Sequence, residues 1–370
     1  MRISGIVGRA ALLLAVAACW VPISYAGFFD DIYYRGPQSA HFNGERFFNP
    51  DGEFGTGGTR KAGPGRFLRF AMGSDRTPWP ASVPVTPAHP AQRVHGTTLK
   101  ATWVGHATVL LQTNGLNILT DPIWSQRASP FSFTGPKRVR APGVAFDDLP
   151  PIDLVLISHN HYDHMDIATL KRLWERDHPL IITSLGNDTL LRRAGIRAQA
   201  RDWGESIAIA GGDQPGDVVV ERVHHWDSRW MADRNRALWS GFTLRLPGGP
   251  IFFAGDTGLG DDSWPKQAAR HGPFRFAIIP IGAFRPRELM SGNHIGPVEA
   301  VHVFRELNAG NALAVHWGTF QLSSEGVDEP RQVLRAELRR NGIASDRFRA
   351  TEAGETIDIP PLQPAETPEP

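Results

Sequence analysis

Cysteine is nearly missing from this chain, whose 370 residues include only Cys19. One cysteine excludes an intramolecular disulfide as a source of stability. An excess of one charge is also missing, because 39 Lys and Arg face 38 Asp and Glu, for a formal net charge of +1. Such a balance gives no support for nucleic acid as a partner, so an anionic partner must be bound by local positive charge.

Long apolar runs are missing as well. The run at 10–18 is too short to span a bilayer as a helix, and no other stretch approaches about 18 residues. We therefore expect the remainder to be soluble. Arg2 and Arg9 precede the run, and Ser24-Tyr25-Ala26 places small residues around a cleavage position. Residues 1–26 are thus predicted to be a secretory signal peptide that directs export to the periplasm or cell envelope.

The position of Cys19 leaves a second form of export open. Residues 16–19 (VAAC) are similar to a lipoprotein processing box, which would make a lipidated Cys19 the first mature residue. The apolar residues 20–23 that follow do not form a polar tether, which favours cleavage after Ala26. That cleavage leaves no cysteine, and therefore no thiolate ligand, in the mature protein.

Three regions are predicted after the signal peptide. Residues 27–95 are rich in Gly, Pro and aromatic residues without a strand or helix period, and are expected to form an N-terminal extension and linker. Residues 96–358 are expected to form one domain. Residues 359–370, rich in Pro and Glu, are predicted to be a disordered tail.

Strands and helices alternate in the predicted domain. Short apolar runs predict strands at 99–104, 109–112, 116–120, 154–157, 218–220, 242–246, 251–253, 276–279 and 313–315. Apolar residues at helical spacing predict helices at 167–176, 298–307 and 333–340. Asn114-Gly115 predicts a hairpin turn. Hairpins followed by alternating strands and helices indicate an α/β layered sandwich.

The strongest chemical pattern is the segment 158–166, between a predicted buried strand and a predicted helix. It contains His159, His161, Asp163 and His164 within six residues. Zinc binds imidazole and carboxylate, usually with four ligands in tetrahedral array. We expect the first two histidines of this group to bind one ion and Asp163 with His164 to bind a second, which leaves both ligand sets incomplete.

Three further residues complete the two ligand sets. His225, Asp256 and His316 each follow an apolar run, and a buried polar residue there needs a partner. Asp256 and His316 alone could equally be capping or polar core residues. Together with the turn they predict that His225 completes the first site, His316 the second, and Asp256 bridges both. Strand alternation places His225 on the face of Val219 and does not by itself exclude His224.

Two more polar residues are expected to support these ligands from outside. His106 and Asp121 lie in Gly105-His106-Ala107 and Thr120-Asp121-Pro122. We predict that they hold ligand imidazoles in one tautomer.

Beyond these residues, several longer sequence segments are characteristic of one protein family. They are 103–109 (WVGHATV), 127–130, 135–138, 149–153, 158–164 (SHNHYDH), 252–258 (FFAGDTG), 279–283 and 316–320. Over most of 41–357 the chain resembles the N-acylphosphatidylethanolamine-hydrolysing phospholipase D family of the metallo-β-lactamase superfamily.

The resemblance implies a four-layer αββα sandwich and two Zn²⁺ ions per chain. It implies cleavage of the head-group-side phosphodiester of a phospholipid, giving phosphatidic acid and an alcohol, with peripheral membrane contact. His294 matches a histidine beside the metals, so Asp163 and His294 are the candidate catalytic residues. Gly296 and Val298 stand where we would expect acidic residues, a departure from the family pattern.

Charge counting favours a phosphodiester over a carbonyl substrate. Two Zn²⁺ with Asp163, Asp256 and a hydroxide keep one net positive charge, which a phosphodiester monoanion neutralises. An imidazole suits general acid work, so His294 is expected to protonate the leaving group. Arginine is usually a solvated surface residue. The candidates for contact with the phosphate group are nevertheless Arg127, Arg138, Arg229, Arg285 and Arg287.

Two alternatives stay open. The same ligands permit a hydrolase of lactones or other carbonyl esters. A non-catalytic envelope protein that stores zinc or presents aromatic residues to lipid is disfavoured by the complete ligand set.

Overall fold

The computed structural model describes residues 31–52 and 75–362, together with 63, 65, 69, 70, 72 and 73 between them. The predicted signal peptide at 1–26, Cys19, and residues 363–370 of the predicted tail lie outside the described residues. Within the described part of the chain, no helix has the length and apolar character needed to cross a membrane.

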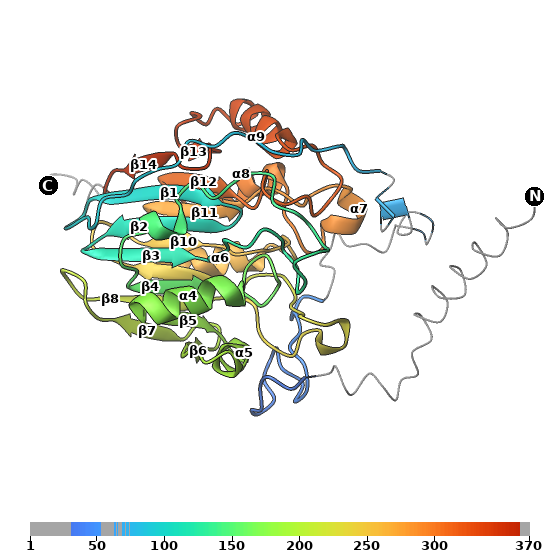
Figure 1. Ribbon diagram of the computed structural model, residues 1–370, viewed down its shortest axis with the longest axis horizontal. Helices are drawn as coiled ribbons and strands as arrows, with labels where there is room; N and C mark the ends of the chain where they lie inside the picture. Colours follow the sequence, from blue (N-terminus) through green and yellow to red (C-terminus); the bar gives the residue numbers. More distant parts are fainter. Residues whose placement is uncertain are drawn as a thin grey trace, which may run out of the picture.

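Two seven-stranded sheets form the centre of the fold (Figure 1). The first has the order β14-β1-β2-β3-β4-β5-β6 and the second β13-β12-β11-β10-β9-β8-β7. The strands of the first sheet are β1 (Leu99–Gly105), β2 (Thr108–Thr113), β3 (Leu116–Thr120), β4 (Leu154–Ile157), β5 (Leu180–Ser184), β6 (Gln199–Arg201) and β14 (Thr356–Ile359). Those of the second are β7 (Ser206–Ile209), β8 (Gly216–Glu221), β9 (Gly241–Arg245), β10 (Ile251–Phe253), β11 (Phe276–Pro280), β12 (Asn311–Val315) and β13 (Phe348–Arg349).

Each sheet is antiparallel in one half and parallel in the other. Strands β1 to β3 pair antiparallel, and β3 to β6 pair parallel. In the second sheet β7 to β10 pair antiparallel, and β10 to β13 parallel. The predicted hairpin turn joins β2 to β3, with φ of 54° at Asn114 and 71° at Gly115, as a two-residue turn of this kind requires.

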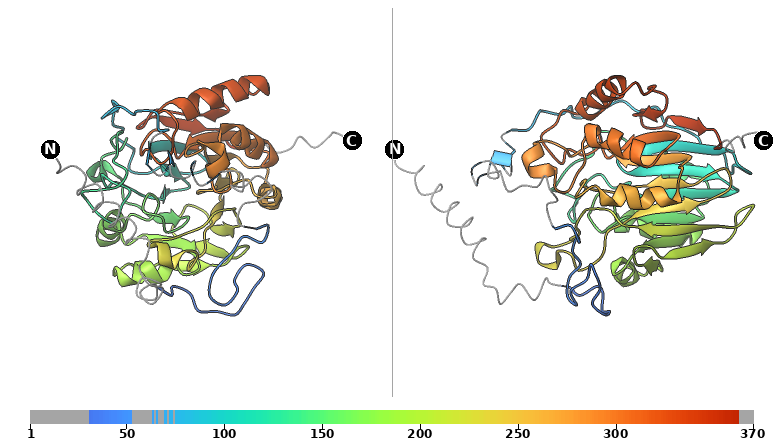
Figure 2. Two further views of the ribbon diagram at one scale, coloured as in Figure 1. Left: turned by 90° about the vertical axis from the view of Figure 1, so that its right-hand side faces the viewer. Right: turned by 180° about the vertical axis from the view of Figure 1, so that it is seen from behind.

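Helices cover the outer faces of both sheets (Figures 1 and 2). The helices after β4 are α4 (Ile167–Asp177), α5 (Asn187–Arg193), α6 (Ser263–Ala268), α7 (Arg287–Met290), α8 (Pro297–Glu306) and α9 (Glu329–Arg340), of which α7 lies beyond the strand ends. Leu170 and Leu173 of α4 pack with Val155 and Ile157 of β4, so α4 covers the first sheet. Helix α8 packs on β11 and covers the second. The predicted four-layer αββα arrangement is confirmed.

The larger hydrophobic core includes the side chains between the two sheets, among them Leu111, Leu156 and Phe253. Burial of this apolar surface, at roughly 25 cal/mol per Å², holds the sheets together. Phe42 and Phe47 from the N-terminal extension belong to the same core. The extension therefore packs on the domain, at least through these residues.

The predicted tail boundary at 358 is wrong by a few residues. Ile359 is the last residue of β14 and pairs with Leu99. Leu362 N also donates to Gly248 O. The tail prediction failed here because Pro360 and Pro361 indicate loop, whereas pairing with β1 holds the residues just before them.

Candidate metal centre

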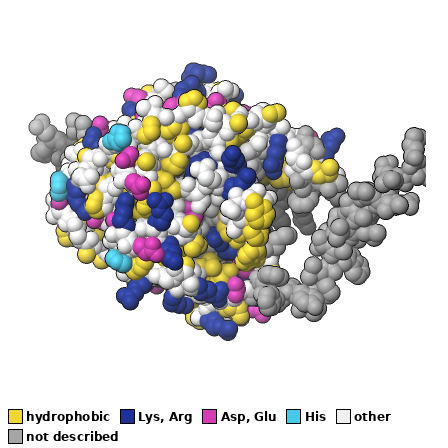
Figure 3. Space-filling model, in the orientation of Figure 1, with side chains coloured by type: hydrophobic (Ala, Val, Ile, Leu, Met, Phe, Trp, Pro, Cys, Tyr) yellow, Lys and Arg dark blue, Asp and Glu magenta, His cyan; other side chains and the backbone are white. Residues whose placement is uncertain are grey.

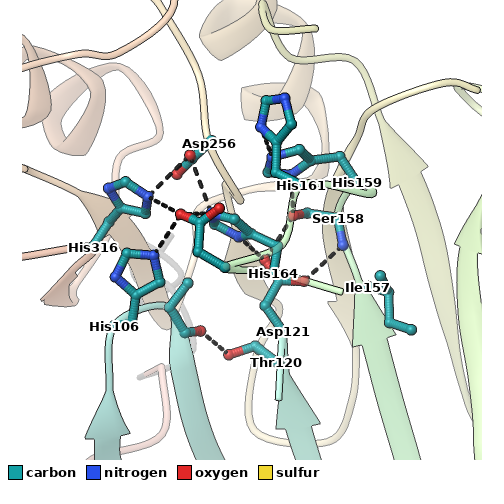
Figure 4. Close-up of polar contacts among 12 residues, drawn as sticks. His106, Thr120, Asp121, Ile157, Ser158, His159, His161, His164, Asp256 and His316 are labelled. Carbon is teal, nitrogen blue, oxygen red and sulfur yellow. Dashed lines mark hydrogen bonds and ion pairs between the residues drawn. The ribbon is translucent and has the colours of Figure 1, made fainter. Parts of the chain in front are cut away.

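The seven predicted ligands gather at one edge of the sandwich, most of them directly after strands, and Figure 4 labels His159, His161, His164, Asp256 and His316. The turn with His159 follows β4, Asp256 follows β10, and His316 follows β12. Parallel strands bring their carboxyl ends to one edge of a sheet, where α/β proteins commonly place their sites. Gly255, with φ of 61°, allows Asp256 its position, since a Cβ there would lie 2.6 Å from Ser158 Cβ.

Three histidines form what we call the first cluster: His159, His161 and His225. His159 Nε2 lies 2.8 Å from His161 Nδ1, which lies 3.4 Å from His225 Nε2. Zn–N bonds of about 2.0–2.1 Å in a tetrahedron put ligand atoms about 3.3 Å apart, near these separations. Burial lowers the pKa of His159 and His225 well below the ordinary value and that of His161 to about 3. Neutral imidazoles of this kind are what a metal ion requires.

The second cluster consists of Asp163, His164, Asp256 and His316. His164 Nε2 lies 3.3 Å from Asp163 Oδ2 and 3.1 Å from Asp256 Oδ2. His316 Nε2 lies 3.3 Å and 3.0 Å from the same two oxygens. The four atoms are thus spaced as ligands of a second ion. Asp256 Oδ2 also lies 3.9 Å from His225 Nε2, so this carboxylate stands between the clusters.

Charges attract within the second cluster. Burial opposes the charged form of its histidines, but Asp256 and Asp163 raise the pKa of His316 to about 9 and that of His164 well above the ordinary value. Burial likewise opposes charge on both carboxylates, and His164 outweighs it and holds their pKa well below the ordinary range. The two carboxylates are therefore ionised, as metal ligands must be.

Three buried atoms of this cluster make no hydrogen bond among the described residues: His164 Nε2, Asp256 Oδ1 and His316 Nδ1. An unsatisfied buried polar group costs about 1–3 kcal/mol and calls for an explanation. Metal coordination at His164 Nε2 and Asp256 Oδ1 would satisfy these two atoms. The buried His and Asp clusters are consistent with a site for two metal ions.

Residues outside the two clusters orient the predicted ligands through hydrogen bonds. Asp121 Oδ2 lies 2.6 Å from His164 Nδ1, and Ser158 donates to Asp121 through both its N and its Oγ. The prediction that Asp121 holds an imidazole is therefore confirmed. The same prediction for His106 is wrong, because His106 Nε2 bonds the carboxylate of Asp163 at 2.8 Å and not an imidazole.

The structure separates the two neighbouring histidines after β8. His225 Nε2 faces the first cluster, and its Nδ1 bonds Asn293 O at 2.9 Å. His224 instead directs Nδ1 to Asp51 Oδ2 at 2.8 Å. Strand alternation could not decide here, because β8 ends at Glu221.

His294 lies at the border of the centre, with Nδ1 3.7 Å from Asp256 Oδ2 and its side chain 14% exposed. Its ring centroid is 5.2 Å from that of His225 and 5.5 Å from that of His316. Burial lowers the pKa of His294 to about 4. The imidazole is therefore neutral at neutral pH.

The five candidate phosphate arginines are engaged elsewhere. Arg127 and Arg138 donate to backbone carbonyls of their own loop region. Arg285 pairs with Glu329, and Arg287 pairs with Glu299.

Arg229 donates to Asn160 O at 3.0 Å and Met165 O at 2.8 Å, and so clamps the metal-binding turn. These contacts thus give all five arginines a structural role.

Comparison with known proteins agrees with the fold. The family described as beta-lactamase superfamily domain matches residues 116–317. The isothiocyanate hydrolase from Delia radicum gut bacteria is 22% identical, with a TM-score of 0.56 over 70% of this chain and 99% of that protein. Igni18, a metallo hydrolase from Ignicoccus hospitalis, is 21% identical, with a TM-score of 0.53 over 71% of this chain and 98% of its own. The family match and the buried clusters define a protein of the beta-lactamase superfamily with residues placed to hold metal ions.

Two related proteins of named activity indicate which members of the superfamily this chain resembles. N-acyl-phosphatidylethanolamine-hydrolyzing phospholipase D 1 of Caenorhabditis elegans is 36% identical over 266 residues, covering 70% of this chain and 75% of the worm protein. The mitochondrial enzyme of that name from Saccharomyces cerevisiae is 33% identical over 69% of this chain and 55% of the yeast protein. The chain belongs to the metallo-β-lactamase superfamily, as a member similar to the N-acylphosphatidylethanolamine-hydrolysing phospholipases D.

Proposed function

We propose that this protein is a dinuclear zinc phosphodiesterase. Its substrate would be a phospholipid, cleaved on the head-group side to phosphatidic acid and an alcohol. The observation that carries the proposal is Asp256, whose carboxylate stands between two clusters of metal-type ligands at one edge of the sheets. The similarity to the worm enzyme supports the choice of bond and substrate class.

Bound zinc ions would supply hydroxide near neutral pH, hold phosphate oxygens and stabilise the leaving alkoxide. The chain's own residues fix the geometry. Asp121 holds the proton of His164 on Nδ1 and leaves Nε2 free as a ligand. Asn293 O does the same for His225. His106 orients the carboxylate of Asp163 through its hydrogen bond to Oδ2.

His294 is better suited to hydrogen bonding than to proton delivery. Its lowered pKa already disfavours an imidazolium, and nearby cations would lower it further. Its buried Nδ1 has no hydrogen-bond partner among the described residues. We propose that the neutral ring donates an N–H to the leaving oxygen or to a phosphate oxygen, and so helps stabilise the transition state.

A loop beside the centre is our candidate for membrane contact. Phe131 and Phe133 are 45% and 78% exposed, and their ring centroids lie 5.4 Å apart. Phe131 and Arg127 line a cavity of about 480 Å³ that Tyr162 and Arg229, next to the metal-binding turn, also line. Figure 3 shows hydrophobic side chains next to Lys and Arg on the face drawn. Aromatic rings with nearby basic groups favour an anionic lipid surface.

The aromatic residues of the N-terminal extension that the structure describes do not offer such a surface. Tyr33 is buried and donates to Asp233, and Tyr34 packs against Phe42 and Phe47. These rings cover the protein's own domain. Phe28 and Phe29 lie outside the described residues.

A substrate panel tests the proposed reaction. Zinc-loaded protein is incubated with phospholipids of different head groups, a short-chain soluble phosphodiester, lactones and β-lactams, and the products are identified. We expect phosphatidic acid and the free head-group alcohol, with Asp256→Asn as the inactive control. Turnover of lactones without phosphodiester cleavage would replace the proposal with the carbonyl-ester alternative. The predicted export is part of the proposal and is tested by locating the protein in cell fractions.

A further inference from the structure

The N-terminal segment, residues 31–52, lies against the loop that carries His225. We call residues 222–236 the His225 loop. Tyr33 Oη donates to Asp233 Oδ2 at 2.7 Å, and Phe47 N donates to Asn235 O at 2.8 Å. Arg46 Nη2 donates to Ala232 O at 3.1 Å. The far part of the loop is thus held by a segment from the other end of the sequence.

Two side chains of the same segment bond the proposed metal ligand His225 and the residues just before it. Asn49 Nδ2 donates to His225 O at 2.8 Å, and Asn49 is only 6% exposed. Asp51 accepts from His224 Nδ1 at 2.8 Å and from Arg222 Nη2 at 2.7 Å, with its side chain 4% exposed. The bond from Asn49 holds the backbone carbonyl of His225, and the bonds of Asp51 hold the side chains of Arg222 and His224 that precede it.

A second support of this backbone comes from the residues that follow β10. His224 N donates to Thr257 Oγ1 at 3.0 Å, and Gly258 N donates to His224 O at 2.7 Å. These bonds hold the backbone of His224, whereas the bond to the carbonyl of His225 comes from Asn49. The N-terminal segment therefore completes the support of the ligand.

The His225 loop in turn holds the metal-binding turn. Asn160, between two ligands of the first cluster, donates from Nδ2 to Asp227 Oδ2 at 2.9 Å. Arg229 donates to two carbonyls of the same turn, and its guanidinium lies 3.7 Å from the ring centroid of Tyr162. Displacement of the loop would therefore disturb the first cluster from two directions.

We infer that Asn49 and Asp51 are positioning residues that set the metal affinity of the first cluster by fixing where His225 lies. The inference rests on the proposed metal site. Asn293 O fixes the rotation of the His225 ring, but it does not fix the position of its backbone. A site must be held within about 0.5 Å, and loss of such outer partners typically lowers metal affinity about 10–100-fold.

The test compares zinc affinity in Asn49→Ala and Asp51→Asn with that of a matched control, His41→Ala. His41 belongs to the same segment but bonds Asp202 at 2.7 Å and stacks on Trp203, away from His225. Titration of the full chain against a competing chelator gives two zinc dissociation constants. The binding step that is lost in His161→Ala identifies the first cluster.

We expect both test variants to weaken zinc binding at the first cluster about tenfold or more and zinc binding at the second cluster less than about twofold. His41→Ala should change neither, although its unfolding temperature falls. If Asn49→Ala does not fold, Asp51→Asn, which keeps the side-chain size, decides alone. Equal loss of thermal stability in all three variants with unchanged first-cluster affinity would overturn the inference. Failure of the wild type to bind two zinc ions would instead refute the proposed metal site.

Discussion

Replacing Asp121 by Asn should put a proton on the wrong nitrogen of His164. The Asp121 side chain is fully buried, and its Oδ2 lies 2.6 Å from His164 Nδ1, so Nδ1 carries the proton and Nε2 is free for a metal ion. The new amide could keep its oxygen toward Ser158 N, from which Asp121 Oδ1 now accepts at 2.8 Å. Its NH₂ would then face His164 Nδ1 and donate to it, which drives the imidazole proton to Nε2.

The expected effect is a loss of affinity in the second cluster. Loss of a hydrogen-bond partner of a ligand histidine typically lowers metal affinity about 10–100-fold, which corresponds to about 1.4–2.7 kcal/mol of binding free energy. First-cluster affinity should fall as well, because Ser158 Oγ donates to Asp121 Oδ2 at 2.6 Å and lies 2.8 Å from Nδ1 of the ligand His159. The assay is zinc titration against a competing chelator, with unfolding temperatures measured for the metal-free protein.

Asp166→Asn is the matched control for this change. Asp166 is also a buried carboxylate, and it accepts from Ser125 N and Thr169 Oγ1 without contacting a histidine. It should lose stability but bind both ions normally. Second-cluster affinity in Asp121→Asn within about twofold of wild type would refute the tautomer argument.

The remaining predictions concern metal content, the bridge, pH and lipid. Elemental analysis of the purified protein should find two zinc ions per chain, and a single tightly bound ion would contradict the dinuclear assignment. Asp256→Asn should keep the fold but lower turnover more than about tenfold, since it removes charge between the clusters; near-normal turnover would exclude it from the site. The metal-free protein should lose stability as pH falls below about 6.5, because the unfolded chain protonates His159, His161 and His225 while burial keeps their folded pKa lower. Constant unfolding temperatures between about pH 7 and pH 5 would contradict this. Phe133→Ser should slow hydrolysis of vesicle phospholipid more than that of a soluble phosphodiester, and equal effects on both would argue against membrane contact at this loop.

The amino-acid sequence alone was sufficient for the metal-binding turn and the layered fold. His159, His161, Asp163 and His164 are close together in the chain, so their spacing alone indicated a metal site. Apolar runs such as Leu154–Ile157 are local patterns that show strands directly. The short or mixed elements were not predicted. Strand β6 has three residues and β7 four, and α5 has only seven residues, so each is too short for a clear period.

Tertiary structure decided the partners of these residues. Asn49 meets His225 across a sequence separation of 176, and His106 meets Asp163 across 57. The candidate arginines also found their partners only in the folded chain, where nearby carbonyls and carboxylates compete for the guanidinium. A periodic pattern specifies which face of an element is buried, since that depends on neighbours in the sequence. It does not specify which loops meet at a sheet edge, because that depends on the path of the whole chain.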